Sequence, residues 1–377
     1  MSQETTSSAV ADRGGDLEVG DASKLPSRPL ASVCMFVYNH APYIRESLDS
    51  VLMQRVDFPY EVCMGEDGST DGTREICLEY AQRYPDKIRL LLRDRANPVR
   101  QKYKIPFMHN TVDTVKACRG KYIALLDGDD YWISQSKLSQ QVAALESNPA
   151  CTVAAHYVMR IPEGKPWRTY LVPGLPLREL TVEGLLRERL YIHTSSLLLR
   201  RCPDVDWEIL TDAVCGDVPL LFCHLLRGTG IVLPQVMSVY RVNDSGVYTS
   251  ESAISQVQRA SALWETFLPF IPTPLRGLHR TGHIKILADA VAEYRKAGLA
   301  KTALRDFRKA LSMIAALETC SLPDRMTLAA EVVESLLFPR LHGLRQQLVR
   351  KLRSRRCQRA FDADLRSRDN ASRGELV

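Results

Sequence analysis

The chain has 377 residues, of which 45% are hydrophobic and 25% charged, as in an ordinary folded protein with one large domain and an extension. Its formal net charge of +6 is too small to argue for nucleic-acid binding. The ten cysteines form no C-x-x-C pair and no Cys/His spacing suited to zinc, and no apolar run reaches the roughly 18 residues needed to cross a bilayer. We therefore expect a reduced, cytoplasmic setting, with at most peripheral contact with the inner face of a membrane.

Residues 1–28 are polar and rich in Ser, Gly and Asp, which predicts a disordered tail that is neither a signal peptide nor an anchor. Short apolar runs then alternate with stretches of helical spacing. The pattern predicts strands at 31–38, 60–67, 87–94 and 121–127, and helices at 39–54, 74–84 and 109–118. Such alternation favours an α/β fold with a mostly parallel sheet covered on both faces, in which ligands bind beyond the carboxyl ends of the strands.

The second half of the chain predicts two further strands and then a change of character. Strands at 191–201 and 231–242 flank a helix that starts in the segment "CGDVPLLFCHLLRG", residues 215–228. Residues 286–314 read as two helices joined near Gly298, without strand signal. We therefore expect an α/β domain over 29–250 and a helical extension over 251–377.

Acidic side chains gather where the strand at 121–127 ends, in the sequence "KYIALLDGDDYW". Asp127 and Asp129 form a D-x-D, and the glycine between them lets the backbone turn and a ligand approach closely. Two carboxylates at this spacing can share a hard divalent cation, Mg²⁺ or Mn²⁺. The alternative is a solvated acidic turn.

A second polar cluster follows the strand at 60–67, in the sequence "EDGSTDGT". Asp67 stands at the strand end, where its carboxylate can accept a hydrogen bond from a nucleobase N–H. The residues after it also suit a plain turn and helix cap, which remains open for this group: Ser69, Thr70, Asp71 and Thr73.

Three segments in this order, "SVCMFVYNHAPYIRESLDSVLMQ", "EDGSTDGT" and "LLDGDDYW", resemble the family 2 glycosyltransferases with the A-type fold. The resemblance is clear over about 30–135 and less distinct over 135–250. It implies a Rossmann-like, mostly parallel sheet with helices on both faces and a nucleotide-sugar donor. In the family, the side chains that match Tyr38 and Asn39 lie against the nucleoside, the one that matches Asp67 contacts uracil, the one that matches Asp127 contacts ribose, and the one that matches Asp129 binds the metal on the diphosphate.

The same resemblance implies a general base. Asp217 in "CGDVPLLF" stands at a predicted helix start and resembles the family's later "GD" or "ED" element, whose carboxylate is the base of inverting members. A carboxylate at a helix N-terminus is expected to stay ionised. A helix cap is the alternative role, and Asp212 is a second candidate for the base. Arg100 and His109 are candidates for contacts with phosphate or acceptor, and Arg100 is placed with the nucleotide.

The stretch "SVYRVNDSGVY" departs from the family pattern. Relatives carry a histidine shortly after "YR" that completes the metal shell, whereas this chain has Asn243, followed by Asp244. We assign Asn243 as a metal ligand together with Asp129. Arg241 either neutralises diphosphate or forms a structural ion pair. Two histidines are expected to be core or helix-face residues: His193 and His224.

Residues 340–359 contain eight Lys or Arg and no Asp or Glu. Their leucines lie on one helical stripe, so the segment predicts a basic amphipathic helix that can lie on an anionic membrane surface. Alternatively, the helix packs on its own catalytic domain. The stripe consists of Leu341, Leu344, Leu348 and Leu352.

Together these features predict an inverting, metal-assisted hexosyl- or N-acetylhexosaminyltransferase of bacterial polysaccharide type, using Mn²⁺ or Mg²⁺. It would move a sugar from a UDP-linked donor to a hydroxyl of a glycan or lipid-linked acceptor, without binding nucleic acid. The rival from another class is a non-catalytic, nucleotide-binding scaffold with the same fold. Metal-dependent binding of UDP would separate the two.

Overall fold

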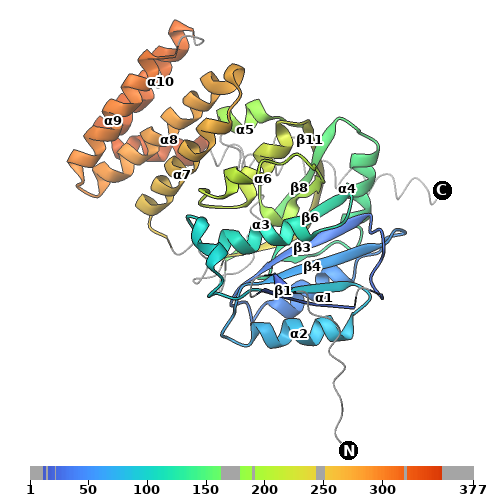
Figure 1. The fold of residues 1–377 in the computed structure, drawn as a ribbon. Coiled ribbons are helices and arrows are strands. Elements are labelled where there is room, and N and C mark those ends of the chain that lie inside the picture. The colour runs from blue at the N-terminus through green and yellow to red at the C-terminus, as the bar shows by residue number, and fades with distance from the viewer. Residues whose placement is uncertain are drawn as a thin grey trace, which may run out of the picture.

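The computed structural model describes residues 12–13, 16–21, 23–162, 179–188, 192–242, 251–317 and 321–349. Its mixed α/β body is built on one large sheet, and a group of helices stands beside it (Figure 1). The strand order in the sheet is β1-β2-β5-β4-β3-β6-β10-β8-β11-β7, with β9 paired to β11.

The parallel part of the sheet is made by β3 (Ala31–Val37), β4 (Tyr60–Glu66), β5 (Ile88–Leu92) and β6 (Tyr122–Asp127). The helices that connect these strands are α1 (Ile44–Leu52), α2 (Thr73–Arg83) and α3 (Phe107–Ala117). Side chains of β3 alternate between two cores: Val33 and Met35 pack with α1 and α2, whereas Cys34 packs with α3. Both faces are therefore covered, as the near-continuous apolar runs predicted.

The second half of the sheet is longer and partly antiparallel. β10 (Leu198–Arg200) runs antiparallel between β6 and β8 (Cys151–Pro162), and β8 pairs in parallel with β11 (Thr229–Val242). The short strands β7 (Tyr131–Trp132) and β9 (Glu179–Leu180) pair with β11. α4 (Lys137–Glu146), α5 (Val182–Glu188) and α6 (Asp217–Leu225) complete this half.

The prediction of a disordered tail over 1–28 is wrong for part of that segment, since β1 (Asp12–Arg13) pairs with β2 (Asp16–Val19), which pairs antiparallel with β5. An added strand satisfies the backbone groups that the edge of β5 would otherwise expose. The Asp16 side chain accepts a hydrogen bond from Asp94 N (2.9 Å), which fixes the strand to the loop after β5.

The helical extension comprises α7 (Ala253–Phe267), α8 (Arg276–Lys296), α9 (Ala300–Ala315) and α10 (Leu322–Leu337). The two helices predicted for 286–314 are confirmed, and Gly298 between them has φ +76°, which favours glycine. α8 contacts α5 closely, because a Cβ at Gly282 would lie 2.2 Å from Leu186 O. Among the described helices, none has the length and apolar character needed to cross a bilayer.

Candidate active site at the strand ends

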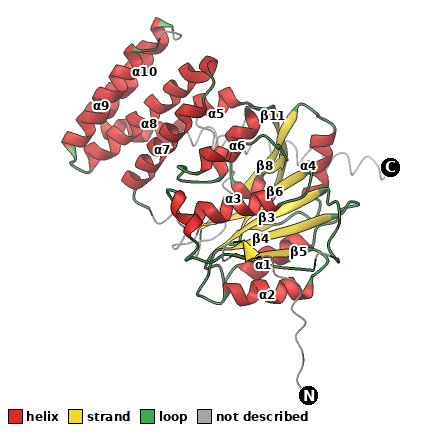
Figure 2. Cartoon of the chain, in the orientation of Figure 1, coloured by secondary structure: helices red, strands yellow, loops and turns green. Residues whose placement is uncertain are grey.

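Two acidic loops meet at the carboxyl end of β3, the central parallel strand. Asp67 N donates to Val37 O and Gly128 N donates to Phe36 O, both at 2.9 Å. The loops therefore follow β4 and β6, the two strands that flank β3 in the sheet (Figure 2). With about 4.8 Å between neighbouring strands, they lie on the order of 10 Å apart. The two acidic loops therefore lie at the same edge of the sheet, as predicted from the strand order.

The D-x-D loop faces the start of α6, where Asp217 is the first helical residue. Burial, and then repulsion from Asp129 and Asp217, raises the pKa of Asp127 to about 8. The three carboxylates therefore share one region of the protein, although within the described residues they form no cluster of ligand atoms within 4.8 Å of one another. Their oxygens suit Mg²⁺ or Mn²⁺, and a cation beside them would favour their charged forms.

Asp217 is a partly buried carboxylate at a helix N-terminus. Its Oδ1 accepts a hydrogen bond from Val218 N at 2.9 Å. We expected the helix terminus to keep this group ionised, but burial dominates and raises the pKa of Asp217. A raised pKa makes the carboxylate a stronger base for a hydroxyl proton. Asp212, the second candidate, is exposed.

The D-x-D loop packs against the segment that contains His193 and Thr194, a contact that was not predicted from the sequence. Asp130 is 1% exposed, and its Oδ2 lies 3.6 Å from His193 Nε2. The Thr194 hydroxyl interacts with Asp127 and lowers the pKa of that carboxyl, against the larger effect of burial. His193 and His224 are both buried, as expected for core residues. The signal available in the sequence was the polar run "HTSS" within the apolar segment 191–201; the strand predicted there is confirmed only for Leu198–Arg200, and Thr194–Ser196 form a 3₁₀ turn.

Arg241 holds the loop from the other side. Its Nη1 donates to Asp129 O at 2.6 Å, and its Nη2 pairs with Glu46. The guanidinium also stands over the Tyr131 ring, 4.3 Å from its centroid. This geometry matches the structural ion pair rather than a free phosphate ligand. Asn243 and Asp244 lie outside the described residues.

His40 is a further side chain at the D-x-D that sequence reasoning missed. Its Nε2 lies 3.9 Å from Asp129 Oδ1, and the two side chains are partly exposed. Burial lowers the pKa of His40, which favours the neutral imidazole. His40 is thus placed where a nitrogen ligand could join Asp129.

The predicted base-binding end contains a buried ion pair. Arg100 Nη1 and Nη2 donate to the two carboxylate oxygens of Asp67 at 2.5 and 3.0 Å, and both side chains are almost fully buried. The Arg95 guanidinium lies 4.5 Å from the centroid of the exposed Tyr38 ring. Next to them is a cavity of about 310 Å³, lined by Leu17, Gly68, Ser69, Arg74, Leu92, Arg93, Asp94 and Arg95.

The polar residues after Asp67 bind the neighbouring loop. Ser69 Oγ accepts from Asn39 N at 2.9 Å, and Asn39 Oδ1 accepts from Thr70 N at 3.0 Å. Asn39 has φ +54°, the one positive value among the non-glycine residues described. Asp71 bonds both Ala41 N and Thr73 N. The alternative role in a turn and helix cap therefore describes these residues well. The side-chain oxygen of Asn39 already accepts a hydrogen bond within the protein.

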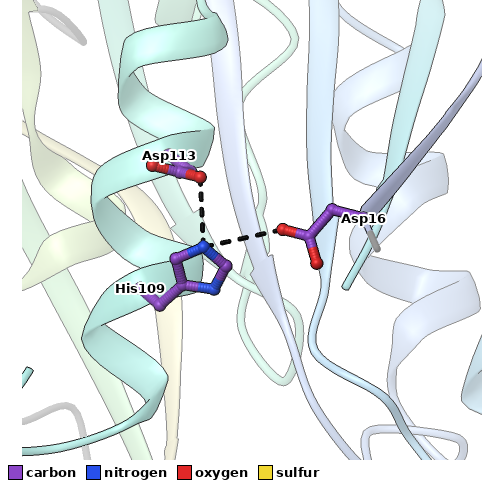
Figure 3. Close-up of side chains that lie close together, drawn as sticks. All are labelled: Asp16, His109 and Asp113. Atoms are coloured by element: carbon purple, nitrogen blue, oxygen red, sulfur yellow. Dashed lines mark ion pairs between the residues drawn. The ribbon is translucent and has the colours of Figure 1, made fainter. Parts of the chain in front are cut away.

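A third acidic cluster, outside this site, joins Asp16, His109 and Asp113 (Figure 3). His109 Nε2 lies 3.6 Å from Asp16 Oδ2 and 3.2 Å from Asp113 Oδ2. Arg93 Nη1 lies 3.2 Å from the same Asp16 oxygen, so a guanidinium already supplies the positive charge that a metal ion would bring. We interpret the cluster as a buried ion network. His109 is 1% exposed and paired within this network, so this geometry gives no support to the prediction that it contacts phosphate or acceptor.

Replacement of Arg93 tests this interpretation. Arg93→Met is expected to destabilise the protein by about 3–5 kcal/mol, because it leaves Asp16 buried without its cation. The measurement is the free energy of unfolding from denaturant titration. Arg45→Met, which removes an exposed ion pair with Glu79, is the matched control and should change stability little. Stabilisation of the wild type by Zn²⁺ or Mn²⁺, lost on His109→Ala, would instead identify a metal site.

Comparison with known proteins agrees with this geometry. Residues 32–202 match the sequence profile of glycosyl transferase family 2. Over these residues the chain is similar to the family 2 glycosyltransferases. The match includes both acidic loops at the strand ends and stops before Asp217.

Several proteins are similar to this chain in sequence. The uncharacterized protein Rv1520 of Mycobacterium tuberculosis is 38% identical over 219 residues, which are 58% of this chain and 60% of that protein. The uncharacterized glycosyltransferase EpsJ of Bacillus subtilis is 29% identical over 162 residues, 43% of each chain. The chain thus spans about 60% of the length of the mycobacterial relative.

A solved structure shares the fold. It is S. aureus TarS 1–349 in complex with UDP-GlcNAc, with a TM-score of 0.51 and 16% identity, covering 84% of this chain and 91% of that one. The sheet of the A-type glycosyltransferase fold, expected from the sequence, is thereby confirmed.

Proposed function

We propose that the chain is an inverting glycosyltransferase that moves a sugar from a UDP-linked donor to a hydroxyl of a glycan or lipid-linked acceptor. The observation that supports this most directly is that the two acidic loops, which follow β4 and β6, meet at the carboxyl end of β3. Like charges in close proximity are costly, so their retention together favours a site built for a cation and a proton transfer.

The donor base is assigned to the end of the site that holds Asp67. Uracil presents an N–H donor beside a carbonyl acceptor, and a carboxylate fixed by Arg100 can accept the former while the guanidinium offers further N–H groups to the latter. Cytosine and adenine lack the N–H at the corresponding ring nitrogen. Tyr38, held under Arg95, supplies an exposed ring against which the base can stack.

A divalent cation would be held by Asp129, with Asp127 and His40 near it. When bound, it supplies positive charge that stabilises the departing diphosphate. We retain Asn243 as a further ligand candidate from the sequence. Either Mn²⁺ or Mg²⁺ suits the carboxylate oxygens.

Asp217 performs the proton transfer. Its carboxylate takes the proton of the acceptor hydroxyl while the acceptor oxygen bonds to the anomeric carbon and the bond from that carbon to the diphosphate oxygen breaks. The sugar is transferred with inversion because the acceptor attacks from the face opposite the leaving group. Arg241 and His193 position the D-x-D loop during this step.

A panel of nucleotide sugars tests the proposal without a known acceptor. Slow hydrolysis is expected for one or more UDP-sugars in the presence of Mn²⁺, and not for CDP- or ADP-sugars, and is followed by release of the nucleoside diphosphate. Hydrolysis of no donor, together with UDP binding that Mn²⁺ leaves unchanged, would favour the non-catalytic scaffold. Asp217→Asn in the same assay excludes a contaminating hydrolase.

A further inference from the structure

The outer side of α10 carries large apolar side chains that nothing in the described chain covers. Leu322, Met326 and Leu337 are 59–70% exposed and lie within about 60° of one another around the helix axis. On the opposite side, Leu328 and Val332 are buried against the rest of the extension. α10 is therefore apolar on two faces, one of which is already used for folding.

The following helix, over residues 339–349, turns two polar residues inward and its leucines outward. His342 is 1% exposed and bonds Asp289 at 3.0 Å, and Gln346 bonds Glu331 of α10 at 2.9 Å. Leu341, Leu344 and Leu348 are 56–62% exposed. A helix that only packed on its own protein would show the reverse arrangement. The alternative in which this stripe packs on the catalytic domain is wrong for these three leucines; Leu352 lies outside the described residues.

The charge of the same segment indicates what covers the stripe. Residues 340–359 hold eight Lys or Arg and no acid, and the two glutamates of α10 that face the helix already bond Arg345 and Gln346. A second copy docked on this face would bring two basic segments together, which opposes association. A surface with an apolar interior and an anionic rim satisfies both the leucines and the arginines.

We propose that this stripe docks the chain on an anionic phospholipid bilayer. The outward leucines of the 339–349 helix enter the boundary of the acyl chains, where Arg340 and Arg345 can meet the headgroups, and the positive charge of the sequence that follows strengthens the attraction. The extension would then hold the glycosyltransferase domain at the surface where lipid-linked acceptors are found. The docking depends on none of the assignments of donor, metal or base.

Vesicle co-sedimentation of the full chain tests this inference. Wild type is expected to pellet with vesicles that contain phosphatidylglycerol at least about tenfold more tightly than with pure phosphatidylcholine, and high salt should weaken the binding. Leu344→Glu with Leu348→Glu should reduce binding to the level of pure phosphatidylcholine. The control is Leu304→Glu. Leu304 is an exposed leucine on α9, outside the proposed docking stripe, so this variant should bind vesicles as the wild type does.

Two measurements keep the result independent of folding and of the proposed function. Circular dichroism and UDP binding should be the same in all variants. Equal binding to both kinds of vesicle, or full binding by the double variant, would overturn the proposal. A concentration-dependent dimer of wild type that the double variant loses would overturn it in favour of a second copy as the occupant.

Discussion

Asp217→Asn is expected to reduce transfer and donor hydrolysis by about 10²–10⁴-fold while leaving the affinity for UDP nearly unchanged. The amide keeps the hydrogen bond from Val218 N and the size of the side chain, but it cannot take a proton from the acceptor. Turnover is measured with the best donor from the panel, and UDP affinity by calorimetry with Mn²⁺ present.

Asp212→Asn is the matched control for this prediction. Asp212 lies five residues earlier, is exposed, and is the other carboxylate considered for the base. It should keep wild-type turnover. If turnover survives in Asp217→Asn and falls in Asp212→Asn, the assignment of the base is reversed.

Asp129→Ala is expected to abolish the gain in UDP affinity that Mn²⁺ gives to the wild type. The carboxylate faces the site from the second position of the D-x-D, while its backbone carbonyl remains bonded to Arg241, so the loop should keep its place. We expect a loss of at least about tenfold in affinity with Mn²⁺, or ~1.4 kcal/mol, and no change when the metal is chelated.

Asp86→Ala, an exposed carboxylate before β5, serves as the control for nonspecific loss of charge. It should retain the whole Mn²⁺-dependent gain. Unchanged dependence on Mn²⁺ in Asp129→Ala would remove this residue from the metal site and leave His40 and Asp127 as the candidates to test.

The parallel half of the fold was predictable because each of its strands is marked locally. β3 to β6 are short and apolar, β4 and β6 lead into turns rich in Asp and Gly, and α1 to α3 have helical spacing, so the acidic strand ends could be placed at one edge. The family profile covers the same region. Local pattern was sufficient wherever each element is buried on both faces or on one clear stripe.

Elements defined by distant partners were missed. β8 was not predicted although Asn148-Pro149 marks a turn before it, because the strands that pair with it, β10 and β11, come from far later in the chain. β2 is a polar segment that becomes a strand because the edge of β5 accepts it and Arg93 neutralises Asp16. The contacts of His40 and Thr194 with the D-x-D were not predicted for a similar reason, since only the folded chain brings these residues together.

The central claim is that Asp129 holds a cation on the diphosphate of a nucleotide at these strand ends. Electron–nuclear double resonance of Mn²⁺ bound to the chain with UDP tests it most directly, through coupling of the metal to phosphorus. We predict a clear phosphorus coupling in the wild type that disappears in Asp129→Ala. Coupling that persists in that variant, or that never appears in the wild type, would contradict the account.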